Sequence, residues 1–151
     1  MFKKKILLFI SVMTSLLLIS CSSSTGLGTP STYTVVNDLP NATIKIMDVS
    51  TTENTLTVEF SYSGENGLTY GEHFEIEILQ DNTWYTLSYD DKFMQPDIGY
   101  SVESGTPRTE TYSLTRYNSL ASGQYRIIIP VSEERLVGST QYILATEFEI
   151  Q

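Results

Sequence analysis

A short loop runs directly into an apolar strand in the stretch 120-LASGQYRIII-129. Ser and Gly favour a turn, and Tyr125, Ile127 and Ile129 then alternate with their neighbours along one face of a strand. A tyrosine at the start of a strand, preceded by Leu and Gly, is typical of the tyrosine corner of antiparallel sandwiches. There its hydroxyl bonds back to the upstream backbone. The stretch therefore predicts a β-sandwich with Tyr125 at one corner.

The rest of the body repeats the same period-two alternation, broken at short intervals by turn residues. The candidate closest to a helix, Ser132–Val137, is too short to form one by itself. Roughly seven or eight short strands in about 110 residues favour an all-β antiparallel sandwich of the immunoglobulin-like class. The alternation predicts strands at Thr43–Val49, Thr55–Tyr62, Glu72–Leu79, Trp84–Leu87, Thr109–Thr115, Gln124–Ile129 and Gln141–Ile150.

The chain is strongly acidic for its size. Its 151 residues include 9 Lys+Arg and 18 Asp+Glu, a net charge of −9, and its pI is about 4.4. Three of the basic residues are Lys3, Lys4 and Lys5, so the rest of the chain has 9 − 3 = 6 basic against 18 acidic residues, a net charge of −12. Nucleic-acid binding needs clustered basic residues and is not expected. An anionic membrane surface would repel such a body.

The N-terminus carries an export signal. The three lysines precede an apolar run, Ile6–Ile19, which is short for a transmembrane helix. The run ends in Leu18-Ile19-Ser20-Cys21, which resembles the lipobox of bacterial lipoproteins. That resemblance implies cleavage before Cys21, a diacylglycerol on its thiol, and a location on the extracytoplasmic face of the cell membrane. An ordinary signal peptide with an incidental cysteine, or an uncleaved anchor, remains the alternative.

Cys21 is the only cysteine, so no disulfide can form within the chain. The two acyl chains of a diacylglycerol hold a protein stably on a bilayer, so lipid rather than charge would keep the acidic body there. The residues after Cys21 are rich in Ser, Thr, Gly and Pro and predict a flexible tether. The expected organisation is a signal peptide at 1–20, a lipidated cysteine and flexible linker at 21–39, and one sandwich domain at 40–151.

The body resembles the bacterial Ig-like domains found on lipoproteins, mostly of Gram-positive bacteria. Asp81-Asn82-Thr83 departs mildly from the Asp-Gly that the family usually has before its tryptophan. Ile127 stands where antibody domains have a cysteine. The resemblance implies an Ig-like fold and supplies no catalytic residues. Its matching pieces are Tyr70-Gly71-Glu72-x-Phe74, Glu77 leading to Trp84-Tyr85, Leu120-x-x-Gly123-x-Tyr125-Arg126-Ile127, and Glu147-Phe148.

The residues that could perform chemistry do not form a recognisable catalytic set. His73, the only histidine, is expected on a solvated strand face, and no nucleophile pattern accompanies it. Neither an enzyme activity nor a cofactor is therefore expected. The loop with Asp90, Asp91 and Asp97 could bind calcium, although its spacing fits no known calcium loop and a solvated turn is the preferred interpretation.

The aromatic residues after the Asp81-Asn82 turn have two interpretations. Trp84 is expected to fill the sandwich core rather than a sugar-stacking platform. For Tyr85 the two interpretations are equally supported.

One sheet face is a candidate docking surface. Alternation places Ile128 and Ile143 on the outer face of the sheet, bordered by Arg126, Glu75 and Glu77, and exposed apolar residues often mark a partner site. The same face would carry His73, Ala145, Glu147 and Glu149. The hypothesis is that this face docks another envelope protein, and the alternative is an ordinary solvated face.

These patterns predict a lipid-anchored binding or structural module of the cell envelope. A small-ligand or metal-binding lipoprotein that serves a transporter or sensor is the second possibility, and an envelope enzyme is the third.

Overall fold

The computed structural model describes residues 27–89, 98–133 and 140–151. The signal segment, Cys21 and the Asp90, Asp91 and Asp97 loop lie outside these residues, so the predictions made for them stay predictions. In the described part of the chain, no helix is long and apolar enough to cross a bilayer. The described residues form ten strands and one short 3₁₀ helix, η1, with the following bounds: β1 Leu27–Pro30, β2 Ala42–Ser50, β3 Thr55–Tyr62, β4 Leu68–Gly71, β5 Glu75–Gln80, β6 Thr83–Leu87, β7 Gly99–Val102, β8 Arg108–Ser113, η1 Thr115–Tyr117, β9 Gly123–Glu133 and β10 Gln141–Ile150.

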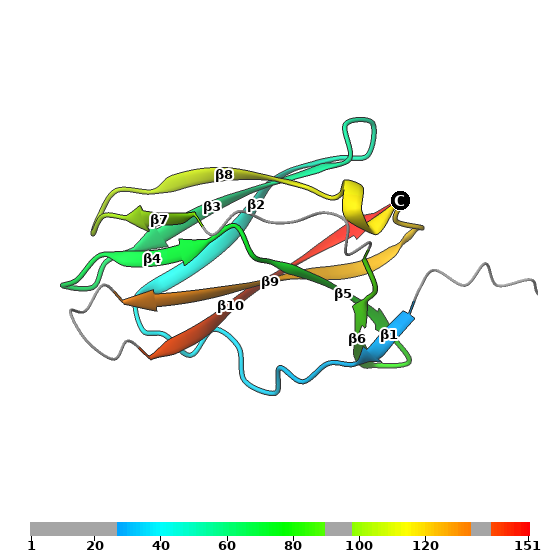
Figure 1. Ribbon diagram of the computed structural model, residues 1–151, viewed down its shortest axis with the longest axis horizontal. Helices are drawn as coiled ribbons and strands as arrows, with labels where there is room; N and C mark the ends of the chain where they lie inside the picture. Colours follow the sequence, from blue (N-terminus) through cyan, green and yellow to red (C-terminus); the bar gives the residue numbers. More distant parts are fainter. Residues whose placement is uncertain (1–26, 90–97, 134–139) are drawn as a thin grey trace, which may run out of the picture.

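The strands form two antiparallel sheets packed face to face (Figure 1). The smaller sheet has the order β2-β3-β8. The larger sheet is centred on β9, which pairs with β10 along one edge and with both β5 and β4 along the other. Beyond β5 this sheet continues through β6 to β1, and beyond β4 it ends at β7. The predicted β-sandwich is confirmed.

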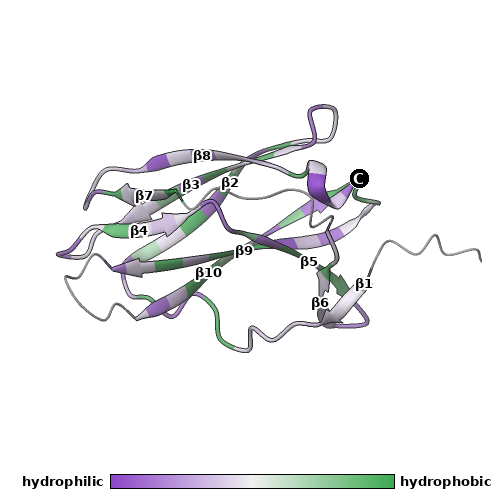
Figure 2. Ribbon diagram, in the orientation of Figure 1, coloured by the Kyte–Doolittle hydropathy of each residue, from purple (hydrophilic) through white to green (hydrophobic). Residues whose placement is uncertain are grey.

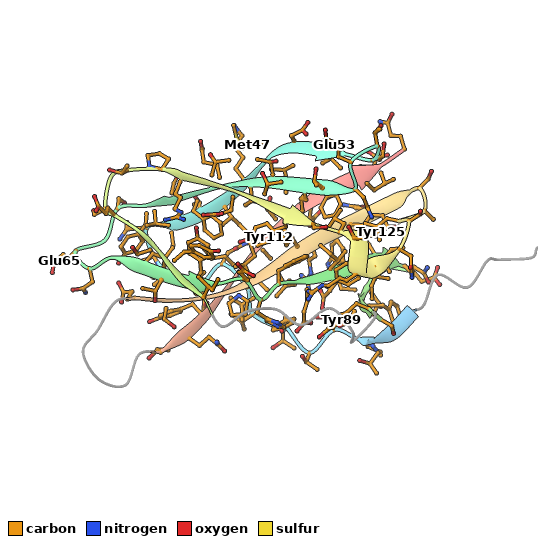
Figure 3. All side chains as sticks on the ribbon, turned by 45° about the horizontal axis from the view of Figure 1, so that its top comes forward. Met47, Glu53, Glu65, Tyr89, Tyr112 and Tyr125 are labelled. Carbon is orange, nitrogen blue, oxygen red and sulfur yellow. The ribbon has the colours of Figure 1, made fainter. Side chains whose placement is uncertain are left out.

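Alternation along the strands builds the core (Figure 2). In β3, Leu56, Val58 and Phe60 are fully buried, while the residues between them are partly exposed. Ile127 and Leu144 of the larger sheet belong to the same core cluster and are also 0% exposed. Tyr112 lies between the two sheets (Figure 3). The core therefore holds by apolar packing, as expected for a domain without a disulfide.

The tyrosine corner is present. The Tyr125 hydroxyl donates a hydrogen bond to the Ala121 carbonyl oxygen over 2.7 Å, and the ring is buried and stacked on Phe148 with centroids 5.6 Å apart. The bond ties the 118–122 loop to the start of β9, which confirms the prediction made from 120-LASGQY-125.

The N-terminal boundary of the domain was predicted wrongly. Residues 27–39 were assigned to a flexible linker, yet β1 pairs with β6, with Leu27 opposite Leu87, and Leu39 is buried in the core. Gly28 is needed in β1, because a Cβ there would lie 2.3 Å from the Thr86 carbonyl oxygen. The Ser/Thr/Gly/Pro composition of the segment concealed a strand whose hydrogen bonds come from a distant part of the chain.

Candidate functional site

The candidate docking residues share the outer face of the larger sheet, as alternation predicted. Across β5 and β9, Glu77 lies opposite Arg126 and Glu75 opposite Ile128. Across β9 and β10, Ile128 lies opposite Ala145. None of these residues belongs to the core cluster between the sheets.

The prediction that this face is exposed is wrong for its centre, whereas Ile143 is partly exposed and His73, Glu147 and Glu149 are exposed. Glu77 and Ile128 are 0% exposed, and Arg126 and Ala145 are each 8% exposed. The chain's own residues 31–38, here called the strap, cross the face between β1 and the start of β2. The strap bonds to Glu75 and to Ala145, the two cross-strand neighbours of Ile128. It therefore passes over Ile128 and removes it from solvent.

The strap is fixed at its two ends by backbone and amide hydrogen bonds. At its start, the Ser31 N–H donates to the Trp84 carbonyl oxygen over 2.8 Å. At its other end, the Asn37 N–H donates to the Ile143 carbonyl oxygen over 2.7 Å. The Asn37 side chain accepts a bond from the Ala145 N–H over 2.8 Å and donates to the Ala145 carbonyl oxygen over 3.0 Å. Asn37 thus covers part of the edge of β10, which would otherwise present unpaired backbone groups.

A buried ion pair lies beneath the strap. Arg126 Nε and Nη2 each lie 2.6 Å from Glu77 Oε2, and the Thr86 hydroxyl donates to Glu77 Oε1 over 3.4 Å. Arg126 Nη2 also donates to the Ser31 hydroxyl over 3.2 Å. Two charges removed from water are stable only when they are paired and hydrogen-bonded. Ser31 of the strap therefore helps to stabilise the buried pair by accepting a hydrogen bond from Arg126.

A second polar contact joins the strap to Glu75. The Tyr33 hydroxyl donates to Glu75 Oε1 over 2.9 Å, and His73 Nε2 lies 3.5 Å from the same oxygen. Partial burial, followed by the hydrogen bond to Glu75, raises the pKa of Tyr33. His73 itself is about half exposed, which agrees with its predicted place on the outer face.

The two aromatic residues of β6 point to opposite faces. Trp84 is not a core residue, contrary to the sequence-based prediction. Its ring lies on the outer face, 4.6 Å from the Arg126 guanidinium carbon. Tyr85 packs against the core instead. The ring of Trp84 therefore stacks with a cation on the covered face and does not fill the space between the sheets.

A buried arginine closes the free edge of β5. Arg116, 5% exposed, stacks against Phe74 and Tyr89, with its guanidinium carbon 4.2 and 4.3 Å from their ring centroids. Its Nη2 donates to the Phe74 carbonyl oxygen, and the Tyr117 hydroxyl accepts from the Ile76 N–H over 3.1 Å. Two side chains thus bond to the edge of β5 just before its pairing with β6 begins.

The hollows of the described surface are shallow. One of about 360 Å³ lies on the outer face where β4, β7 and β9 meet, and Ile98, 45% exposed, stands at its rim. Another of about 560 Å³ is lined mainly by polar residues of the 50–54 and 119–122 turns. Within the described ranges, no group of three or more His, Cys, Asp or Glu side chains could hold a metal ion.

These features define the protein as a two-sheet antiparallel sandwich with a tyrosine corner and no disulfide. The family model described as "Bacterial Ig-like domain" matches residues 38–149, most of the chain. The chain belongs to that family. The matched region starts at the end of the strap, so β1 and nearly all of the strap lie outside it. No curated protein matches the chain.

Proposed function

We propose that this protein is a lipoprotein whose Ig-like domain is a non-enzymatic binding or structural module on the extracytoplasmic face of the cell membrane. The observation that carries the proposal is the lipobox Leu18-Ile19-Ser20-Cys21, which stands directly ahead of an Ig-like sandwich. Lipid on Cys21 would fix the location, and the rigid sandwich would present its loops and edges to other envelope components.

The charge of the chain supports lipid as the anchor. The chain after the signal segment has a net charge of −12 and would be repelled by anionic lipid headgroups. Two acyl chains contribute roughly 0.8 kcal/mol per buried CH₂, which outweighs that repulsion.

The anchor is tested by replacing the thiol. Cys21→Ser is expected to abolish incorporation of labelled palmitate. The variant should then either appear in the soluble extracytoplasmic fraction or remain as the unprocessed precursor. Ser24→Ala, a change in the same segment, should leave both labelling and fractionation unchanged. Palmitate-free wild-type protein in native membranes would contradict the proposal.

We do not propose that a partner binds the centre of the outer face, because the strap covers Ile128 and the Glu77–Arg126 pair. A partner would meet other surfaces. Crosslinking in native membranes should give a discrete protein adduct. A thermal shift produced by calcium, a sugar or another small ligand, without any such adduct, would favour the ligand-binding alternative instead.

A further inference from the structure

We infer that the sandwich is held with its β1 corner beside the membrane and its opposite end pointing outward. The inference rests on the proposed lipid anchor at Cys21. It follows from where the folded unit begins, which the sequence alone placed much further along the chain.

The first step is the length of the tether. A flexible linker through residue 39 would leave 22–39 free, but β1 and the strap bind residues 27–37 to the sheet. Only Ser22, Ser23, Ser24, Thr25 and Gly26 then separate Cys21 from Leu27. Fully extended, they span at most about 20 Å. The β1 corner therefore cannot stand further than that from the lipid.

The second step is the position of β1 in the sandwich. Leu27 lies opposite Leu87, and β1 lies at one end of the long axis of the molecule (Figure 1). The β3–β4 turn with Glu65 lies at the other end (Figure 3). The eleven residues of β9 give the sandwich a length of about 36 Å. The β1 end can therefore lie at most about 20 Å from the bilayer, whereas the Glu65 end can lie up to roughly 55 Å from it.

The negative charge of the domain favours the outward orientation. An acidic domain on a short tether has its lowest electrostatic energy when its long axis leads away from an anionic surface. The outward end then reaches roughly 55 Å from the bilayer at most.

The strap is what makes the short tether effective. It attaches to β5, β6, β9 and β10 through separate hydrogen bonds, so a pull on Cys21 acts on the sheet itself and not on a slack linker. The end that points outward then carries the β3–β4 turn and the 103–107 loop, where the Gly105 N–H donates to the Tyr62 carbonyl oxygen.

The orientation can be measured on the full lipidated protein in vesicles of phosphatidylglycerol and phosphatidylethanolamine. Cys21 is acylated and is the only cysteine, so one introduced cysteine gives a unique label. Ser88→Cys lies beside the β1–β6 pair and Ser63→Cys at the outward end, and both serines are exposed. Energy transfer to a headgroup acceptor should be at least roughly twofold greater from position 88. A Gly/Ser insertion of about 15 residues between Thr25 and Gly26 should reduce that ratio towards one.

Each result has a separate meaning. Equal transfer from both positions in the acylated wild-type background, or greater transfer from position 63, overturns the orientation while the lipid anchor stands. Transfer from neither position, together with protein that does not sediment with vesicles, overturns the anchor itself.

Discussion

Two buried tyrosines of the same core differ in one hydrogen bond. The Tyr125 hydroxyl donates to the Ala121 carbonyl oxygen, whereas the buried Tyr112 hydroxyl has no hydrogen-bond partner among the described residues. Tyr125→Phe should lower the free energy of unfolding by about 1 kcal/mol, because it removes a satisfied bond. Tyr112→Phe should leave it unchanged or raise it by up to about 1 kcal/mol, because it removes a polar group buried without a partner.

Urea unfolding of both variants at neutral pH, followed by circular dichroism, measures this difference. Tyr142→Phe, a change at a partly buried ring packed against the core, serves as the control and should have little effect. A Tyr112→Phe variant as destabilised as Tyr125→Phe would show that the Tyr112 hydroxyl has a partner in solution.

The Glu77–Arg126 pair offers a test of the covered face. Glu77→Leu or Arg126→Met alone should cost about 3–5 kcal/mol of stability, because each leaves a buried charge without its partner. The double variant Glu77→Leu/Arg126→Met should recover most of that loss. Gln124→Ala, which removes the exposed Gln124–Glu147 contact between β9 and β10, should change stability by less than about 1 kcal/mol.

A double-mutant cycle from denaturant unfolding gives the coupling energy of the pair. Single variants within about 1 kcal/mol of wild type would mean that water reaches the pair and that the strap does not seal this face.

The sequence assigned these residues to the correct face but not to the correct environment. Alternation along β5 and β9 fixed Glu77, Arg126 and Ile128 on the outer face, because successive side chains of a strand point to opposite sides. Their burial depends on residues 31–38, which are far away in sequence. Nothing in the local pattern around Trp84 shows that its ring meets Arg126.

At the scale of elements, the strap is held to β10 by Asn37. Asn37 has a φ of 59° and Asn41 a φ of 62°, so both lie in the left-handed region that Asn tolerates and Ala does not. Each Asn→Ala change should therefore cost about 1–2 kcal/mol. Asn37→Ala also loses two hydrogen bonds to Ala145 and should cost about 2 kcal/mol more than Asn41→Ala.

Amide hydrogen exchange by NMR provides the specific measurement. The Ala145 amide, which donates to Asn37 Oδ1, should exchange much faster in Asn37→Ala but not in Asn41→Ala. Unchanged protection of Ala145 in the first variant would show that the strap does not hold the edge of β10.

The strands of five or more residues could be predicted from the sequence and the four-residue strands could not. Thr55–Tyr62 and Gln141–Ile150 were predicted with their observed bounds, because they alternate over eight and ten residues. The prediction began β5 at Glu72, three residues early, and ended β9 at Ile129, four residues short. β1, β4 and β7 have four residues each and were missed, because so short a run carries no readable period.

At the scale of the whole molecule, the tyrosines set an alkaline limit to stability. Burial raises the pKa of Tyr117 to about 12, against an opposing effect of Arg116, and it also raises the pKa of Tyr112 and Tyr70. The native state therefore holds protons that the unfolded chain releases near pH 10. Stability should be flat with respect to these groups below about pH 10 and fall as pH rises towards 12, by about 1.4 kcal/mol per pH unit for each buried tyrosine.

Denaturant unfolding at several pH values between 8 and 11.5 measures this slope. Tyr112→Phe removes one such group without removing a hydrogen bond among the described residues, so its slope above pH 10 should be smaller than that of wild type. An identical slope in the variant would show that Tyr112 does not contribute to the alkaline loss.

The sequence by itself determined the class of the protein. Its period-two alternation and the tyrosine corner at Tyr125 specified a β-sandwich, because both are local features of the chain that packing between two sheets requires. The tertiary structure alone decided what covers the outer face and where the folded unit begins. Both depend on β1 pairing with β6 and on the strap meeting β10, contacts between segments up to about a hundred residues apart whose partners no local pattern can specify.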